Sequence, residues 1–327
     1  MIGPMAAEVT GCGPAPTRRV LLRTAVLAAV TGPLLAACDI RLEDDAPPIP
    51  LLPRKSVPDE AVLVDLVRRT TALAQAAGRV SKPTQAVAGL TSLHQTQADV
   101  LRARLTSDGV PNYVIDGTST TSTTSPTVAI SAPPAATARD VAAGETALVT
   151  AVLSALPTVT AATRAVVASV VACCGAAAEL LGATISWPPA DPLPPEAAVP
   201  LLDATRSAAY ALQVIAAQTG GNQRAVAVST HTDLTARASE LLGMAGSAAP
   251  PDPLGYALPF PITAPDGAAR LANQVLTTLV AGGLAPLASL PDDSTATTTL
   301  VRLLVGAQHL GRSWGVAAVP FPGQAYP

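Results

Sequence analysis

Apolar residues recur at helical spacing, three or four positions apart, along most of the chain after residue 57. Between Pro58 and Gly78 this spacing produces one apolar stripe, which consists of Leu63, Leu66, Val67, Thr70, Leu73, Ala74 and Ala77. Between Pro83 and Leu105 it produces a second stripe, which consists of Leu90, Leu93, His94, Gln97, Leu101 and Leu105. We therefore expect amphipathic helices over these two ranges, and the second stripe predicts that His94 and Gln97 point into the core.

Two more helices are expected over residues 139–156 and 158–182, because a proline interrupts the pattern between them. The central part of the second helix is apolar on nearly every side but is too short to span a bilayer. This pattern is typical of a central core helix. It contains Cys173 and Cys174, whose side chains diverge by about 100° on a helix. We interpret both cysteines as small buried hydrophobic residues, because no Cys/His spacing in the chain resembles a zinc site.

A Pro-rich segment, residues 187–195, precedes a second set of helical patterns. These patterns predict helices over residues 196–219, 222–244, 266–290 and 294–314. The stripe of the first helix consists of Ala198, Leu201, Leu202, Thr205, Ala208, Ala209, Leu212, Ile215 and Ala216. The stripe of the second consists of Val228, His231, Leu234, Ala238 and Leu242, so His231 is also expected to point inward.

The two halves of the chain resemble copies of one another. Adding 137 to the residue number converts His94 into His231 without a gap. Each half also has a long connection after its second helix, which is the ferritin-like arrangement of a four-helix bundle. We therefore predict an all-α protein with two tandem bundles, over residues 58–186 and 195–327, and keep one merged bundle as the alternative. The connection in the first half is Thr/Ser-rich, and the sequence leaves open whether residues 117–127 carry sugars.

The first 57 residues have the pattern of an export and anchoring segment. Arg18 and Arg19 stand before a short apolar run, as in a twin-arginine (Tat) signal, and the run ends in a lipobox whose last residue is Cys38. These features predict a signal peptide over residues 1–37, a lipid on Cys38, and a Pro-rich tether over residues 38–57. We expect the protein to be held on the outer face of the cytoplasmic membrane.

Charge and the predicted lipid anchor indicate which partners to expect. Without residues 1–37 the chain has 17 basic and 22 acidic residues, and no basic patch is interleaved with aromatic residues. We therefore expect no nucleic-acid partner. The expected partners are the membrane, through the anchor at Cys38, and an envelope protein or an apolar ligand.

The chain carries no recognisable catalytic motif. There is no His-Glu-x-x-His and no phosphate-binding glycine loop. A Gly-x-Ser-x-Gly occurs once, as Gly311-Arg312-Ser313-Trp314-Gly315, but it lies at the end of a predicted helix and not at the strand-to-helix turn that a nucleophilic serine of this motif needs. A di-iron bundle needs Glu-x-x-His on two helices, but Thr91 and Val228 stand three residues before the two inward histidines. We expect His94, Gln97 and His231 to lie among aliphatic side chains, with no metal site, cofactor or catalytic residue. On that reasoning, replacing His94 or His231 by leucine changes stability by only about 1 kcal/mol.

Several short motifs in the second half suggest a family. They are Ala209-Tyr210-Ala211, His231, Tyr256-Ala257-Leu258-Pro259, Pro261-Ile262-Thr263 and Phe321-Pro322-Gly323. With them, the segment from Leu201 to Pro322 resembles the ferritin-like domain of unknown function found in actinobacterial exported proteins. The resemblance implies a ferritin-like four-helix bundle in this half. Where such domains commonly have Glu-His before the first tyrosine, this chain has Thr205-Arg206.

Together these patterns predict an exported lipoprotein with a non-catalytic helical scaffold, which binds a partner or has a structural role in the envelope. Two other functions stay open. The first is a metalloprotein or oxidoreductase that uses His94 and His231. The second is a carrier of a lipid or other apolar ligand between Ala-rich helices.

Overall fold

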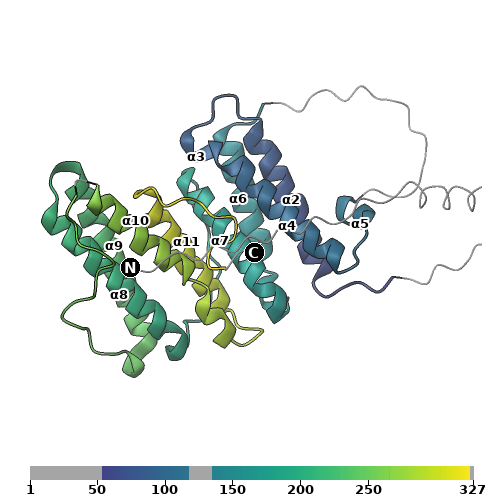
Figure 1. Cartoon of the computed structure of the whole chain (residues 1–327). Coiled ribbons are helices and arrows are strands. Elements are labelled where there is room, and N and C mark those ends of the chain that lie inside the picture. Colours follow the sequence, from purple (N-terminus) through teal and green to yellow (C-terminus); the bar gives the residue numbers. More distant parts are fainter. Residues whose placement is uncertain (1–53, 118–134, 265, 325–327) are drawn as a thin grey trace, which may run out of the picture. The chain divides into compact units, whose positions relative to one another are not determined.

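The computed structural model describes residues 54–117, 135–264 and 266–324. Within these ranges the regular structure is helical and contains no strand, so the all-α prediction is confirmed (Figure 1). The α-helices are α2 (Glu60–Gly78), α3 (Gln85–Ala88), α4 (Leu90–Ser107), α5 (Asn112–Asp116), α6 (Ala138–Leu153), α7 (Ala161–Leu180), α8 (Pro195–Gln218), α9 (Gly221–Ala245), α10 (Gly267–Ala281) and α11 (Ala296–Arg312). The predictions for residues 1–53, and for the Thr/Ser-rich run at 118–125, concern residues outside the described ranges.

In the N-terminal half, α2 packs against α4 and α6, and α6 packs against α7. All seven predicted stripe residues of α2 are buried, as are all six of α4. The helix predicted from Pro83 is in fact two helices, because the chain breaks at Gly89 between α3 and α4. The four long helices of this half therefore cover one another's apolar faces, as amphipathic helices in a bundle do.

In the C-terminal half, α8 packs against α9 and α10, and α10 packs against α11. The predicted stripe of α8 is buried except for Ala216, which is partly buried. Of the predicted stripe of α9 only Leu234 is buried: His231 and Ala238 are partly exposed, and Val228 and Leu242 are 48% and 42% exposed. The expectation that His231 points into the core is therefore wrong. The buried residues of α9 are instead Ala227, Thr230, Leu234, Leu241 and Ala245. The physical reason is that α9 has one main packing partner, α8, so much of its circumference faces solvent.

The two halves meet along α7 and α11, which pack against each other. Gly175 of α7 makes this close approach possible, since a Cβ there would lie 2.7 Å from Cγ2 of Val305. The C-terminal tail also crosses to the first half, where Gln97 donates to the carbonyl of Pro320 (2.6 Å) and Ser169 donates to the carbonyl of Pro322 (2.7 Å). One hydrophobic core runs from Leu63 in α2 to Phe321 in the tail. Independent folding of each half stays a prediction.

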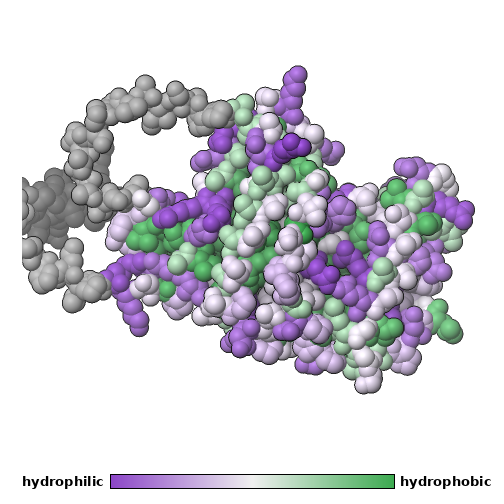
Figure 2. Space-filling model, turned by 180° about the vertical axis from the view of Figure 1, so that it is seen from behind, coloured by the Kyte–Doolittle hydropathy of each residue, from purple (hydrophilic) through white to green (hydrophobic). Residues whose placement is uncertain are grey.

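Two segments of the described residues are long and apolar enough to cross a membrane by length and composition, Ala161–Leu180 and Gly267–Ser289. The first is 78% buried inside the protein and the second is 50% buried. Figure 2 shows hydrophilic and apolar residues interspersed on the face that it presents. The burial of α7 agrees with the prediction of a central core helix.

Candidate functional site

Among the described residues, two groups of polar side chains are candidates for a functional site, one inside the first half and one at the surface of the second. The inner place is a buried polar cluster made of His94 and Gln97 from α4, Glu145 from α6, and Cys174 from α7. Nε2 of His94 lies 2.6 Å from Oε1 of Glu145, and both side chains are fully buried. One ligand-type atom from each of His94, Glu145 and Cys174 lies within 4.8 Å of the other two.

A chain of hydrogen bonds fixes the proton positions in the buried polar cluster. The carbonyl of Pro320 can only accept, so the atom of Gln97 that approaches it at 2.6 Å is the amide nitrogen. The amide oxygen of Gln97 then faces Nδ1 of His94 at 2.9 Å, and Nδ1 must carry a hydrogen. One further proton lies between Nε2 of His94 and the Glu145 carboxylate. The second oxygen of Glu145, Oε2, is buried without a hydrogen-bond partner among the described residues.

Burial and neighbouring charge set the acidity of these groups. Burial by itself lowers the pKa of His94, but the charge and hydrogen bond of Glu145 and the hydrogen bond of Gln97 outweigh it, so the pKa of His94 is raised above its usual value. Burial raises the pKa of Cys173 to about 12, and burial together with Glu145 raises the pKa of Cys174 well above its usual value. Both cysteines are free and buried, as predicted. In the absence of a metal ion, burial therefore favours the protonated thiol of both cysteines.

The sequence interpretation missed Glu145, and this is its main error about the core. The inward faces were expected to be aliphatic around His94 and Gln97, but Glu145 lies opposite His94 with no exposed surface. The signal was present in the spacing. Glu145 stands three or four residues from the buried residues Val141, Ala142, Leu148 and Val149 of α6. A carboxylate on an apolar stripe indicates a buried partner.

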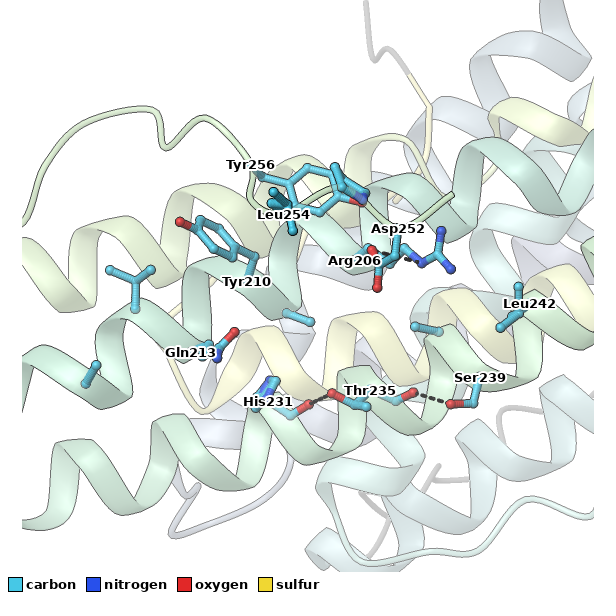
Figure 3. A pocket seen from close by; sticks show the side chains of 15 residues that line it. Arg206, Tyr210, Gln213, His231, Thr235, Ser239, Leu242, Asp252, Leu254 and Tyr256 are labelled. Carbon is cyan, nitrogen blue, oxygen red and sulfur yellow. Dashed lines mark hydrogen bonds and ion pairs between the residues drawn. The ribbon is translucent and has the colours of Figure 1, made fainter. Parts of the chain in front are cut away.

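The outer place is an open pocket of about 580 Å³ between α8, α9 and the connection that follows α9, and we call it the α8–α9 pocket (Figure 3). Its lining residues are Arg206, Ala209, Tyr210, Gln213, Val214, Ala217, His231, Thr235, Ala238, Ser239, Leu242, Asp252, Pro253, Leu254 and Tyr256. This volume lies in the range of small-molecule sites.

An ion pair ties the connection to α8 at one end of the α8–α9 pocket. The guanidinium of Arg206 lies 3.5 Å from the carboxylate of Asp252 and donates to the carbonyl of Pro250 at 3.1 Å. Beside this pair, the rings of Tyr210 and Tyr256 lie 6.1 Å apart at an angle of 51°. Burial and the neighbouring carboxylates, foremost Asp203, raise the pKa of Tyr256, so its hydroxyl keeps its proton at neutral pH.

The floor of the α8–α9 pocket carries hydroxyl groups with defined orientations. Thr235 donates to the carbonyl of His231 (2.9 Å), and Ser239 donates to the carbonyl of Thr235 (3.0 Å), as the dashed lines in Figure 3 show. Because their hydrogens are used by the helix, both hydroxyl oxygens present lone pairs to a ligand. The Tyr210 hydroxyl makes no hydrogen bond with the described residues and can donate or accept.

The two histidines of the sequence repeat therefore have different surroundings. His94 is in the buried polar cluster, as its stripe predicted, whereas His231 is partly exposed and lines the α8–α9 pocket. The structure does not bring them together. Nδ1 of His231 is buried without a hydrogen-bond partner among the described residues. Cys38, Arg18 and Arg19, the predicted lipidation and export residues, lie outside the described ranges.

Comparison with known proteins concerns the C-terminal half. A family model described as "Domain of unknown function (DUF4439)" matches residues 197–326. This match confirms the expectation of a domain of unknown function in this half. It contains the α8–α9 pocket and the C-terminal tail, whereas His94, Glu145 and Cys174 lie outside it. No curated protein and no solved structure matches the chain.

Proposed function

We propose that this protein is an exported, lipid-anchored binding protein, and that its ligand is a neutral oligosaccharide held in the α8–α9 pocket. The proposed localisation rests on the order of three sequence features: Arg18 and Arg19, an apolar run, and a lipobox at Cys38. A diacylglyceryl cysteine supplies two acyl chains, which is enough for stable anchoring. The protein would then face the glycans and proteins outside the cytoplasmic membrane.

The observation that carries the ligand assignment is the placement of Tyr210 and Tyr256 over neutral hydrogen-bonding groups. The whole chain has only eight aromatic residues, four of them tyrosines, and two of those tyrosines line this pocket. Tyrosine combines an apolar ring face with a polar tip. A sugar ring has the matching character, with an apolar C–H face and hydroxyl groups around its edge.

The charges in the α8–α9 pocket favour a neutral ligand. Among the described lining residues, Arg206 and Asp252 carry full charges, and they pair with each other at 3.5 Å. The other polar groups are hydroxyls, an amide and an imidazole. An anionic or cationic ligand would have to compete with the existing ion pair, whereas a neutral ligand leaves it in place. Binding without chemical conversion fits this lining, because Thr235 and Ser239 donate their hydrogens to the helix backbone.

The test is calorimetric titration of the mature protein with two neutral probes, tri-N-acetylchitotriose and maltotriose. We expect one of them to bind, and Tyr210→Ala to weaken that binding about fivefold, because an aromatic contact contributes about 1 kcal/mol. Tyr113→Ala is the matched control, since Tyr113 lies on α5 in the other half and is 48% exposed. Equal affinities of the two variants would contradict the proposal.

The competing function is lipid transport, and a separate measurement distinguishes it from oligosaccharide binding. Native mass spectrometry of protein extracted with a mild detergent reports any co-purifying lipid. The proposal expects no stoichiometric noncovalent lipid besides the acyl chains on Cys38. A bound lipid that Leu242→Asp removes would assign the pocket to an apolar ligand instead, because Leu242, like Leu254, is an exposed apolar residue of the lining.

A further inference from the structure

We propose that the buried polar cluster is a zinc site, with Nε2 of His94, a carboxylate oxygen of Glu145 and Sγ of Cys174 as ligands. This inference is independent of the α8–α9 pocket, since the three residues belong to α4, α6 and α7 in the other half. Imidazole nitrogen, carboxylate oxygen and thiolate sulfur are the three ligand types that zinc takes in proteins. Three helices that are far apart in sequence each contribute one ligand.

The separations of the three ligand atoms fit one metal ion. They lie within 4.8 Å of one another. Zinc bond lengths place the ligand atoms of a tetrahedral site roughly 3.3 to 3.8 Å apart. The His94 and Glu145 atoms are closer than this, at 2.6 Å, because they now share a proton. A side-chain shift of about 1 Å converts the hydrogen-bonded pair into two ligands.

Gln97 supplies the orientation that a metal-binding histidine needs. Ligating histidines nearly always donate their other ring N–H to an oxygen, which fixes the tautomer and the ring plane. Here the Gln97 oxygen accepts from Nδ1 of His94, and the carbonyl of Pro320 holds the Gln97 amide in that orientation. Nε2 is left as the nitrogen that can bind a metal. Gln97 and Pro320 are therefore positioning residues of the site.

A buried polar atom without a partner points to the same ligand. Oε2 of Glu145 has no hydrogen bond with the described residues, in a side chain with no exposed surface. Leaving a carboxylate oxygen unpaired in the core is costly. A divalent ion bound between His94, Glu145 and Cys174 would supply the missing interaction.

Charge balance favours a divalent ion over a monovalent one. Zinc displaces the proton shared by His94 and Glu145 and the thiol proton of Cys174, so two protons are released for each ion bound. The ion's two positive charges then match one carboxylate and one thiolate, with a neutral imidazole, and the core carries no net charge. A monovalent ion that displaced both protons would leave one buried negative charge, so it could not bind the Cys174 thiolate and the Glu145 carboxylate together without that cost.

Because the cluster is buried, the experiment loads the protein during refolding. The full-length mature protein is unfolded, refolded with Zn²⁺ or with EDTA, and freed of excess metal by gel filtration. We expect one zinc per chain after refolding with Zn²⁺, measured by elemental mass spectrometry, and a higher melting temperature than after refolding with EDTA. Refolding with Co²⁺ should produce a thiolate-to-cobalt charge-transfer band, which tests the sulfur ligand without any substitution.

Neighbouring residues give matched variants. Cys174→Ser and Glu145→Gln should each lower zinc affinity more than about 100-fold, and Gln97→Leu about 10- to 100-fold as the positioning residue. Cys173→Ser is the control and should lower zinc affinity far less than Cys174→Ser, because Cys173 supplies no ligand atom and reaches the site only through Gln97. Circular dichroism checks that each variant folds. Absence of bound zinc and of the cobalt band in the wild type would overturn the proposal, as would equal zinc retention by the two cysteine variants.

Discussion

Replacing His94 by leucine tests the energetics of the buried polar cluster in the metal-free protein. Leucine has a similar volume but lacks the imidazole, whose Nε2 is hydrogen-bonded to Oε1 of Glu145 at 2.6 Å. Glu145 would then be a buried carboxyl group with neither oxygen satisfied, and removing one partner of a buried pair costs about 3–5 kcal/mol. This value replaces the 1 kcal/mol expected from the sequence, which assumed an aliphatic environment around His94.

The size of the effect makes it measurable by thermal unfolding in EDTA. At about 2.1 cal/mol/K per residue, the entropy of unfolding of some 270 residues is about 0.57 kcal/mol/K. The expected cost therefore lowers the melting temperature by roughly 5–9 °C. The control His309→Leu, on the exposed part of α11, should lower it by no more than about 1 °C.

The double variant His94→Leu/Glu145→Met separates the cost of an orphaned charge from the cost of lost packing. Replacing both members of a buried pair by apolar residues of similar volume is often neutral or stabilising. We expect the double variant to melt well above His94→Leu alone, because it removes the orphaned carboxyl group and retains only the cost of the Gln97 amide oxygen, which loses its donor in both variants. The reasoning is refuted if His94→Leu melts like the wild type, or if the double variant melts lower than the single one.

The remaining predictions concern the helix contact between the halves, a helix cap and the anchor. Gly175→Ala should destabilise the protein by about 1–2 kcal/mol, because the added Cβ would lie 2.7 Å from Val305. Gly243→Ala should stabilise the protein by about 0.5–1 kcal/mol, because its added Cβ meets nothing within 4 Å. Urea unfolding measures both changes. Hydrogen bonds from Thr137 lower the pKa of the Asp140 carboxyl group in the folded protein. The ionised carboxylate therefore stabilises the fold above the unfolded-state pKa of 3.8, and this contribution is lost as pH falls through the lower pKa of the folded state. Asp140→Asn should remove that part of the pH dependence of the melting temperature. Cys38→Ala should release the protein from membranes or leave its signal peptide uncleaved, which cell fractionation and intact-mass measurement detect. Membrane retention of that variant with normal processing would contradict the anchor.

The sequence predicted most accurately those helices whose apolar face is covered by neighbouring helices. The stripes of α2 and α4 are correct at every position, because each helix packs against partners along its length. Of the predicted stripe of α9 only Leu234 is buried, because periodicity cannot show that α9 has one main partner and an open pocket beside it.

The site could be predicted only in part, because its contacts join residues far apart in sequence. His94 and Gln97 were both expected to point into the core, and the structure places Nδ1 of His94 2.9 Å from the amide oxygen of Gln97, three residues away. Its second partner, Glu145, is 51 residues away, and the carbonyl that orients Gln97 belongs to Pro320, 223 residues away. Such pairings depend on how the helices and the tail pack, and local spacing carries no information about them.

The assignment of the α8–α9 pocket as a binding site is tested most directly by the histidine Hε1 resonances of the protein in solution. The chain has three histidines, and they lie in three different environments: His94 in the buried polar cluster, His231 in the α8–α9 pocket, and His309 on α11. The His231→Gln variant identifies the pocket signal by its disappearance. When tri-N-acetylchitotriose or maltotriose is titrated into the wild-type protein, we expect a saturable shift of the His231 resonance while the other two stay in place. A His231 resonance that stays in place at millimolar concentrations of both sugars, or a shift confined to His309, would contradict the assignment.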